Sequence, residues 1–264
     1  MKAKFATRTI LAALLLLPVV GWAQPEGLQT IKLNGPNTKR GLPVMEALSV
    51  RASVREWSDK DLVLQDLSDL LWAANGINRP DSKKRTAASA MNAQDVDVYV
   101  FRKDGAYLYD AASQSLVPVV AGDYREEIAM RPGGPGGPGA PGAPGGPPPQ
   151  RPEGAPAPKP GEAPPMKPGQ GPGAKPPMGP PSPAPVVLVL VSDASRFRGG
   201  TPELKSEWGA LDTGIVSQNI ALFCAGTGMA TRPRAGMNKE KIASLLKLKD
   251  TQRPFLNHPV GYPK

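Results

Sequence analysis

The chain of 264 residues contains one cysteine, Cys224, and one histidine, His258. A single cysteine excludes an intrachain disulfide, and the scarcity of both residue types argues against a zinc site. Cys224 lies inside an apolar helical pattern far from His258 in sequence, which argues against a Cys/His nucleophile. We therefore expect no metal ligands, no catalytic side chain of this kind, and a buried role for Cys224.

Long apolar runs are missing from the chain except at its start. A basic stretch precedes the apolar residues Ile10 to Val20, and small residues stand where a signal peptidase reads. This pattern predicts a secretory signal peptide at residues 1–23, with an uncleaved anchor as the alternative. The run is short for a membrane span. We predict an exported, periplasmic or extracellular protein without a stable membrane span after cleavage.

The middle of the chain has almost no apolar side chains to bury. Residues 132–185 hold 22 prolines and 14 glycines among 54 residues, so burial cannot offset the entropy of ordering them. We predict a disordered loop with partial polyproline II character. Five collagen-like triplets raise a triple helix as an alternative, but the three-residue period then breaks down. Neither flank holds a complete core, so residues 42–264 are interpreted as one interrupted domain, preceded by a polar lead at 24–41.

The positive charge is modest once these segments are set aside. The formal net charge is +9, of which the predicted signal peptide carries +3 and the insertion +2. The remaining charge of about +4 is no nucleic-acid footprint, so we expect no nucleic-acid partner.

The remaining residues predict an α+β domain. Apolar residues at helical spacing predict helices at 43–49, 62–74, 124–130, 203–225 and 239–246. Alternating or β-branched runs predict strands at 96–101, 106–109, 116–120, 186–191 and 229–231. The last of the long runs, 186–191, is typical of a strand covered on both faces. Residues 78–85 read as a polar loop and 254–264 as an extended tail.

Two helix details follow from single residues. Ser89 and Asn238 are predicted N-caps. Small residues weaken an isolated helix, so their presence inside 203–225 indicates the close approach of another helix; they are Gly209, Ala210, Gly214 and Ala221.

Two short motifs could carry chemistry. Arg51-x-Ser53-x-Arg55 places alternating side chains on one side of an extended segment, where two guanidiniums and a hydroxyl can converge on a phosphate. Asn92, within Ser89 to Gln94, can donate and accept hydrogen bonds toward a polar ring edge. The alternative for the Arg51–Arg55 motif is an ordinary solvated surface. The alternative for the second motif is a helix cap at Ser89 followed by two exposed amide side chains. Neither a Walker A loop nor GxGxxG follows a strand, so the common nucleotide-binding folds are not supported.

Taken together and in order, these segments resemble the FMN-dependent nitroreductase family. The family's Pro-Ser-x-x-Asn-x-Gln segment is similar to residues 88–94, its central helix and Gly turn to 212–229, and its closing Val-Gly-Tyr-Pro to 260–263. The chain departs from the family in having Ala52, Ala88 and Asp95 where Arg, Pro and Pro are common. The resemblance implies a central, mostly antiparallel sheet flanked by helices, an FMN cofactor and a homodimer with the site at its interface.

The resemblance also implies which residues contact FMN. Arg51, Ser53 and Arg55 would hold the phosphate and the pyrimidine side of the ring, with Arg55 as the positive charge near N1 and O2. Asn92 would contact the isoalloxazine. The loop up to Gly236 would offer backbone N–H groups near N5 and O4, and Lys264 would lie at the phosphate. The whole predicted set is Arg51, Ser53, Arg55, Ser89, Asn92, Gln94, Pro233, Arg234, Ala235, Gly236 and Lys264.

The implied reaction is ping-pong hydride transfer through FMN, to or from a small organic substrate such as a nitroaromatic, quinone or heterocycle. Gly76 to Asn78 and Tyr107 to Asp110 lean toward the thiazoline and oxazoline dehydrogenases of the family. Export leaves the electron donor open, because NAD(P)H is cytoplasmic. The alternatives are a flavin-binding or degenerate-site interaction module without turnover, and a structural surface protein.

Overall fold

A computed structural model describes residues 27–129 and 183–264. Its main feature is a seven-stranded sheet in the order β1-β6-β5-β4-β7-β9-β8, in which every neighbouring pair is antiparallel. The strands are β1 (Ile31–Lys32), β4 (Val96–Phe101), β5 (Gly105–Asp110), β6 (Ser115–Ala121), β7 (Val186–Asp193), β8 (Ala230–Thr231) and β9 (Gln252–Gly261). The predicted signal peptide and almost all of the predicted insertion lie outside the described residues.

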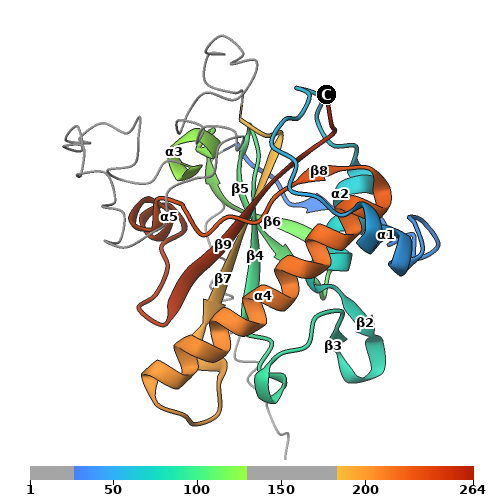
Figure 1. Cartoon of the computed structure of the whole chain (residues 1–264). Helices are drawn as coiled ribbons and strands as arrows, with labels where there is room; N and C mark the ends of the chain where they lie inside the picture. Colours follow the sequence, from blue (N-terminus) through green and yellow to red (C-terminus); the bar gives the residue numbers. More distant parts are fainter. Residues whose placement is uncertain (1–26, 130–182) are drawn as a thin grey trace, which may run out of the picture.

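Helices cover both faces of this sheet (Figure 1). One face packs against α2 (Leu64–Asn75) and α4 (Pro202–Thr227), and α1 (Val44–Val50) packs against α4. The other face packs against α3 (Arg125–Ala129) and α5 (Lys239–Leu246). Strand β7 shows why: Leu188 and Leu190 join the first core, and Val187, Val189 and Val191 join the second. The prediction of a strand covered on both faces is confirmed.

The predicted elements match the observed ones closely where local signals are strong. The strand at 96–101 and the helix at 239–246 have the predicted bounds. The carboxamide of Asn238 accepts a hydrogen bond from the N–H of Lys241 at 3.0 Å, which confirms the predicted cap. Helix α4 begins at Pro202 and ends before Gly228, whose φ of 74° suits a glycine C-cap.

Two local predictions are wrong, and a third holds only in part. The polar loop at 78–85 forms a small hairpin of β2 (Ile77–Arg79) and β3 (Lys84–Arg85) around a 3₁₀ turn at Pro80–Ser82. The tail forms β9, which lies between β7 and β8 although it contains Pro254 and Pro259. Ser89 stands at the N-cap position of a single 3₁₀ turn (Ala90–Asn92) but makes no capping hydrogen bond, because its hydroxyl accepts from the N–H of Gln94 instead.

The small residues of α4 serve two different contacts. A Cβ on Gly209 would lie 2.3 Å from Oγ of Ser192, so this glycine lets the helix approach strand β7 rather than another helix. At the other end of α4, Gly226 lies against Leu42 and Ala47 at the start of α1. Gly214 has open space where a Cβ would be. Helix α4 does pack against α1 and α2, but the predicted role of its small residues is wrong at Gly209, and Gly226 was not among the residues on which the prediction rested.

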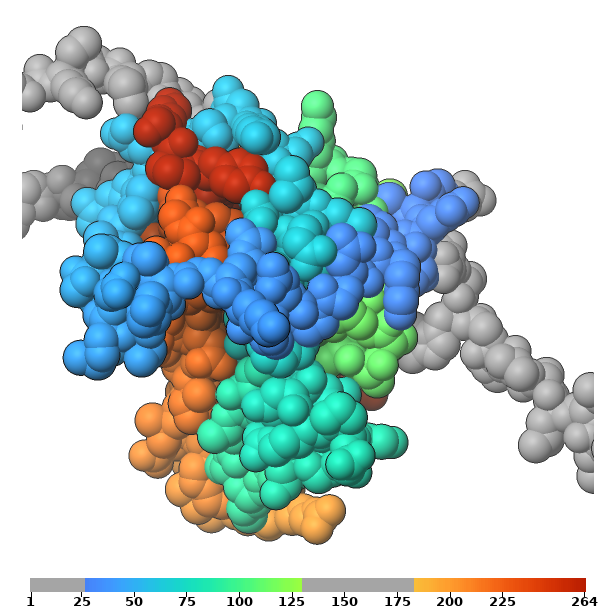
Figure 2. Space-filling model, turned by 90° about the vertical axis from the view of Figure 1, so that its right-hand side faces the viewer, coloured from blue at the N-terminus to red at the C-terminus, as the bar shows by residue number. Residues whose placement is uncertain are grey.

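The N-terminal segment packs against the domain instead of trailing from it. Arg40 forms ion pairs with Asp66 and Asp69 of α2, at 2.6 and 2.9 Å. The N–H of Leu42 donates to the carbonyl of Gly226 at 2.9 Å. Figure 2 shows this segment in blue, crossing one face of the molecule beside α4 in orange. At the insertion's far end Ala184 is also buried, and its carbonyl accepts from Arg125.

The closing Val-Gly-Tyr-Pro segment ties β9 to α2 through one hydroxyl. Tyr262 donates to Oδ2 of Asp66 and accepts from the N–H of Val63 at 3.1 Å. We expect Tyr262→Phe to lower the free energy of unfolding by about 1 kcal/mol, because both hydrogen bonds are lost while the ring remains. Urea unfolding measures the effect. Tyr124→Phe is the control, since the Tyr124 hydroxyl has no hydrogen bond in the described part; equal losses in both variants would contradict this role.

Candidate functional site

The predicted phosphate segment runs beside β8 and the end of β9. The N–H of Val54 donates to the carbonyl of Thr231 at 2.9 Å, and the N–H of Ser58 donates to the carbonyl of Tyr262 at 2.8 Å. Val54 is half-buried between exposed neighbours, so Arg51, Ser53 and Arg55 are all accessible to a ligand, as an alternating extended segment requires. The segment is fixed by strand-like hydrogen bonds, and its polar side chains remain exposed.

A cluster of arginines that lacks anionic partners lies at the same place. Burial, and next the charge of Arg55, lower the pKa of Arg232; burial, and next the charge of Arg232, lower the pKa of Arg234. These three arginines are called the arginine cluster below. Nε of Arg232 is buried and has no hydrogen-bond partner among the described residues. No ion pair within 27–129 and 183–264 neutralises the cluster. The accessible guanidinium of Arg55 and the unpaired buried donor of Arg232 fit a phosphate group.

Arg232 is the side chain that the sequence analysis missed. Only the backbone of its loop was assigned a role there, because the residue stands outside the Arg51–Arg55 motif. The available signal was its place directly after the short strand at 229–231.

The loop after Arg232 is held by Asn257. The guanidinium of Arg234 donates twice to Oδ1 of Asn257, at 2.9 and 2.7 Å, and their backbones exchange two hydrogen bonds. The N–H of Arg234 is thus engaged inside the protein. The exposed N–H groups of Ala235 and Gly236 remain the donors for the predicted flavin contact. Lys264, also predicted at the phosphate, is exposed beyond the end of β9.

His258 lies under this site and is neutral. Its side chain is fully buried, and burial followed by the charge of Arg234 lowers its pKa to about 3. Thr231 donates to the carbonyl of Pro259, so Thr231 Oγ1 accepts from Nδ1–H of His258, and Nε2 accepts from the Ser217 hydroxyl at 2.8 Å. The imidazole thereby links β8, β9 and α4 beneath the arginine cluster.

This burial predicts a pH-dependent stability. The folded pKa of His258 lies below the unfolded value, so its contribution is present above about pH 6.5 and is lost as pH falls toward 3. Between pH 6.5 and 4.5 we expect the wild type to lose about 2–3 kcal/mol of unfolding free energy relative to His258→Gln. Urea unfolding of both proteins across this range measures the difference. Parallel pH profiles would show that His258 does not titrate on unfolding.

Cys224 takes no part in this chemistry. It is fully buried in α4, and burial raises the pKa of its thiol. A thiol in this environment stays protonated and unreactive.

The predicted ring-contacting segment, Ser89 to Gln94, is held elsewhere. Its Ala90 N–H donates to Oδ2 of Asp212 in the middle of α4, at 2.8 Å. The Gln94 side chain accepts from Arg85 and donates to the carbonyl of Lys83, so it is bound to the β2–β3 hairpin. The predicted flavin contacts of Ser89 and Gln94 stay predictions.

Met91 and Asn92 are the exposed residues of that segment. The φ of Asn92 is 53°, in the left-handed region. Asn92 is therefore the exposed residue of Ser89 to Gln94 that carries an amide.

The two halves of the candidate site lie apart within one chain. The arginine side is anchored near the Gly226 end of α4, and the Ala90 side is anchored at Asp212. Those 14 positions correspond to about 21 Å along a helix. In Figure 2 the C-terminal end of the chain, in red, lies at the top, and the teal segment around residues 75–95 lies at the bottom. The structure does not bring the halves together.

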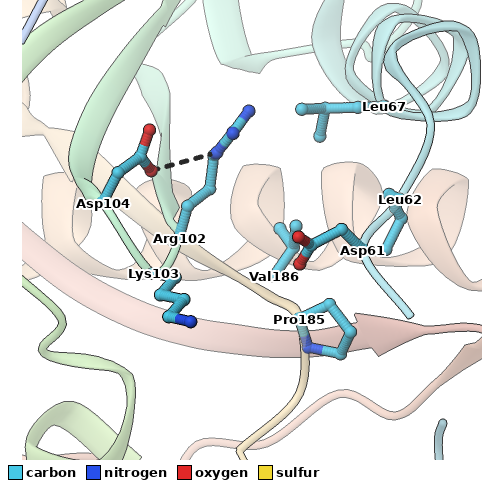
Figure 3. Close-up of a pocket in the computed structure, with 8 residues that line it drawn as sticks. All are labelled: Asp61, Leu62, Leu67, Arg102, Lys103, Asp104, Pro185 and Val186. Carbon is cyan, nitrogen blue, oxygen red and sulfur yellow. Dashed lines mark hydrogen bonds and ion pairs between the residues drawn. The ribbon is translucent and has the colours of Figure 1, made fainter. Parts of the chain in front are cut away.

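One pocket contains none of the predicted residues. It encloses about 450 Å³ and is lined by Asp61, Leu62, Leu67, Arg102, Lys103, Asp104, Pro185 and Val186. Figure 3 shows Arg102 paired with Asp104 on one wall, with Asp61 and Leu62 on the opposite side. None of the three arginines of the cluster lines this pocket.

Neither a membrane-spanning helix nor a metal-binding cluster occurs within the described residues. No helix there is long and apolar enough to cross a membrane. No group of three or more His, Cys, Asp or Glu side chains there is arranged to hold a metal ion.

Solved structures resemble this chain over nearly its whole length. A candidate nitroreductase from Ralstonia eutropha JMP134 is 25% identical, covers 94% of this chain and 98% of its own, and has a TM-score of 0.66. A chain of the Escherichia coli microcin synthetase McbBCD complex, with truncated pro-MccB17 bound, is 16% identical over 97% of this chain and 85% of its own, with a TM-score of 0.57. No curated protein matches.

The model of the nitroreductase family matches residues 48–262. This match spans both motifs, α4 and the closing strand, and it agrees with the antiparallel α+β fold of the structural relatives. Members of the family are oxidoreductases that typically bind FMN and are commonly dimeric. The chain belongs to the nitroreductase family of oxidoreductases.

Proposed function

We propose that this protein is an exported, FMN-dependent oxidoreductase that transfers hydride by a ping-pong mechanism to or from a small organic substrate. The arginine cluster is the observation that carries the proposal. Arg55, Arg232 and Arg234 lie together without anionic partners in the described chain, and Nε of Arg232 is buried and unpaired. A phosphate would accept from Arg55 and from Nε of Arg232, and charge-assisted hydrogen bonds to arginine are among the strongest in proteins.

The flavin supplies hydride transfer when bound, and the protein's residues supply binding and orientation. Arg51, Ser53 and Arg55 would hold the phosphate side, with Arg55 placing positive charge near the pyrimidine. The N–H groups of Ala235 and Gly236 would donate toward the ring. No side chain is assigned as a general acid or base, which agrees with the buried states of His258 and Cys224.

We also propose that the protein works as a homodimer, with the site completed by the partner. Helix α4 exposes Leu204, Leu211 and Ile215 at helical spacing, with Leu211 61% exposed. Helix α1, beside the arginine end of α4, exposes further apolar side chains: Val44, Met45 and Leu48. Apolar residues on one continuous face favour association. A second copy placed on it could bring Asn92 of the partner subunit to the arginine cluster, which one chain does not achieve.

The substrate class follows less directly. The similarity to a chain of the microcin synthetase complex agrees in fold with the predicted heterocycle-dehydrogenase subgroup. We propose a small organic acceptor or donor, and an electron donor other than cytoplasmic NAD(P)H if the chain is exported. The proposed reaction uses no metal cofactor and no nucleic-acid partner.

Steady-state kinetics of the FMN-loaded protein test the proposed reaction. With a chemical reductant and a quinone or nitroaromatic acceptor, we expect parallel double-reciprocal lines, because donor and acceptor use the same site in turn. Flavin that stays bound but is not reoxidised by any acceptor faster than free FMN would contradict turnover. That result would favour the alternative, a flavin-binding or degenerate-site interaction module.

A further inference from the structure

Two buried carboxyl groups lie directly beneath the Ser89–Gln94 turn. Asp95, at the start of β4, is fully buried, and Asp212 on α4 is 4% exposed. The hydroxyl of Ser192 donates to Oδ2 of Asp95, and Oδ1 of Asp95 has no hydrogen-bond partner in the described part of the chain. Burial raises the pKa of Asp95 to about 7; Ser192 opposes the rise, and contact with the Asp212 carboxyl adds to it. The unpaired oxygen and the neighbouring carboxyl are the arrangement of an acid pair that shares a proton.

The acid pair is connected to both ends of the turn. Oδ2 of Asp212 accepts from the N–H of Ala90 at 2.8 Å, near the beginning of the turn. Asp95 follows Gln94 directly in sequence, and its carbonyl accepts from the N–H of Asp193 at 2.9 Å. The acids thereby fix the turn between α4 and the sheet.

The turn requires such support because its backbone is strained. Met91, Asn92 and Gln94 have φ values of 52°, 53° and 50°, in the left-handed region that L side chains rarely adopt. Such residues cost free energy and persist where their surroundings hold them. The three strained positions include Asn92, whose side chain is exposed.

We propose that Asp95 and Asp212 are positioning residues that share one proton and hold the Ser89–Gln94 turn in the conformation that presents Asn92 to the flavin ring. With one proton, the pair carries a single negative charge, and Asp212 accepts from Ala90. Without it, two anions lie buried side by side, and their repulsion acts against the packing of the turn on α4. The flavin as the ligand of Asn92 rests on the proposed function. The Asp95–Asp212 pair and its hold on the turn do not.

The acid pair should hold the turn more weakly as the pH rises. The folded pKa of Asp95 lies above its unfolded value, so the stabilisation is complete below about pH 4 and is lost as pH rises through about 7. The hold on the turn should therefore weaken between pH 6 and 8.

Other charged groups on the surrounding elements have their own partners. Asp97 on β4 pairs with Arg196, which also lies near Asp193 at the end of β7. Arg253 on β9 donates to Ser206 of α4. Three further charged side chains lie nearby: Arg85 donates to Gln94, and Lys205 and Asp250 line a pocket together with Ser192. Burial also raises the pKa of Asp97, so its contribution has to be separated by a variant of its own.

Hydrogen exchange of the Ala90 amide in the full chain tests the positioning role without flavin. After correction for the intrinsic exchange rate, we expect protection in the wild type to fall at least tenfold between pH 6 and 8. Asp95→Asn should remove this step, because an amide can donate to Asp212 at every pH. Asp97→Asn is the matched control and should keep the step. Identical pH profiles in the wild type and Asp95→Asn would overturn the inference.

A second variant, Ser192→Ala, keeps the inference testable if Asp95→Asn does not fold. Ser192→Ala removes the hydroxyl that lowers the pKa of Asp95, so it should move the step to higher pH by a measurable amount. An unmoved step would count against the pair.

Retention of added FMN, measured over the same pH range, separates this inference from the proposed function. Retention should fall together with Ala90 protection. A protection step without FMN retention at any pH would support the acid pair and contradict the proposed function. FMN retention that is flat across a clear protection step would overturn the positioning of Asn92 toward the flavin.

Discussion

Replacing Arg51 and Arg55 together by alanine should abolish FMN retention. Both side chains are exposed on the extended segment beside β8, and Arg55 lies near Arg232, whose Nε is buried and has no partner among the described residues. A hydrogen bond to a charged group contributes about 1.5–3 kcal/mol. Losing two should weaken FMN binding by about two to four orders of magnitude. Equilibrium titration followed by flavin fluorescence measures the change.

The matched control removes two cations elsewhere. Arg102 and Lys103 line the pocket of Figure 3, which contains no arginine of the cluster, so Arg102→Ala with Lys103→Ala should leave FMN affinity within about twofold. An equal loss in both double variants would mean that net charge, rather than a site, attracts the cofactor. Unchanged flavin content in the Arg51/Arg55 variant would contradict the site assignment.

Leu211→Glu should convert the dimer to a monomer and remove FMN retention with it. Leu211 is 61% exposed at the centre of the α4 stripe, where a second copy would bury it. A carboxylate there would have to be desolvated against its symmetry mate, which costs several kcal/mol. Analytical ultracentrifugation measures the oligomeric state, and the stability of the monomer should be nearly unchanged because the side chain lies outside the core.

Val117→Glu is the corresponding control for the dimer. Val117 is 36% exposed on β6, away from α1 and α4, so this variant should stay dimeric and retain FMN. A Leu211→Glu protein that remains dimeric would exclude this helix face as the interface. A monomer that binds FMN with wild-type affinity would show that the site is complete in one chain.

Sequence alone predicted the elements whose signals are local. The β-branched run of β7 and the Asn238 cap of α5 each contain their own physical reason. Strand β9 was missed because Pro254 and Pro259 disfavour a central strand by local rules. It is accommodated because the β7–β9 register shifts between Leu190 and Val191, where Pro254 pairs. Such a bulge depends on both strands and cannot be read from one.

The candidate site also has a part that local sequence predicts and a part that depends on tertiary contacts. The Arg51–Arg55 motif could be found in the sequence because alternation places both arginines on one side of an extended segment. The role of Arg232 depends on the pairing of Val54 with Thr231, a contact between residues 177 positions apart. Likewise, the acid pair joins Asp95 to Asp212 through tertiary packing, and Asp95 alone registered only as a departure from the family pattern.

The most direct test of the central claim is an absorbance spectrum of the purified chain lacking residues 1–23, taken after incubation with FMN and desalting, together with its molar mass. The account predicts a retained flavin spectrum with about one FMN per subunit in a dimer. A protein that elutes without flavin would contradict the account and would favour a degenerate member of the fold.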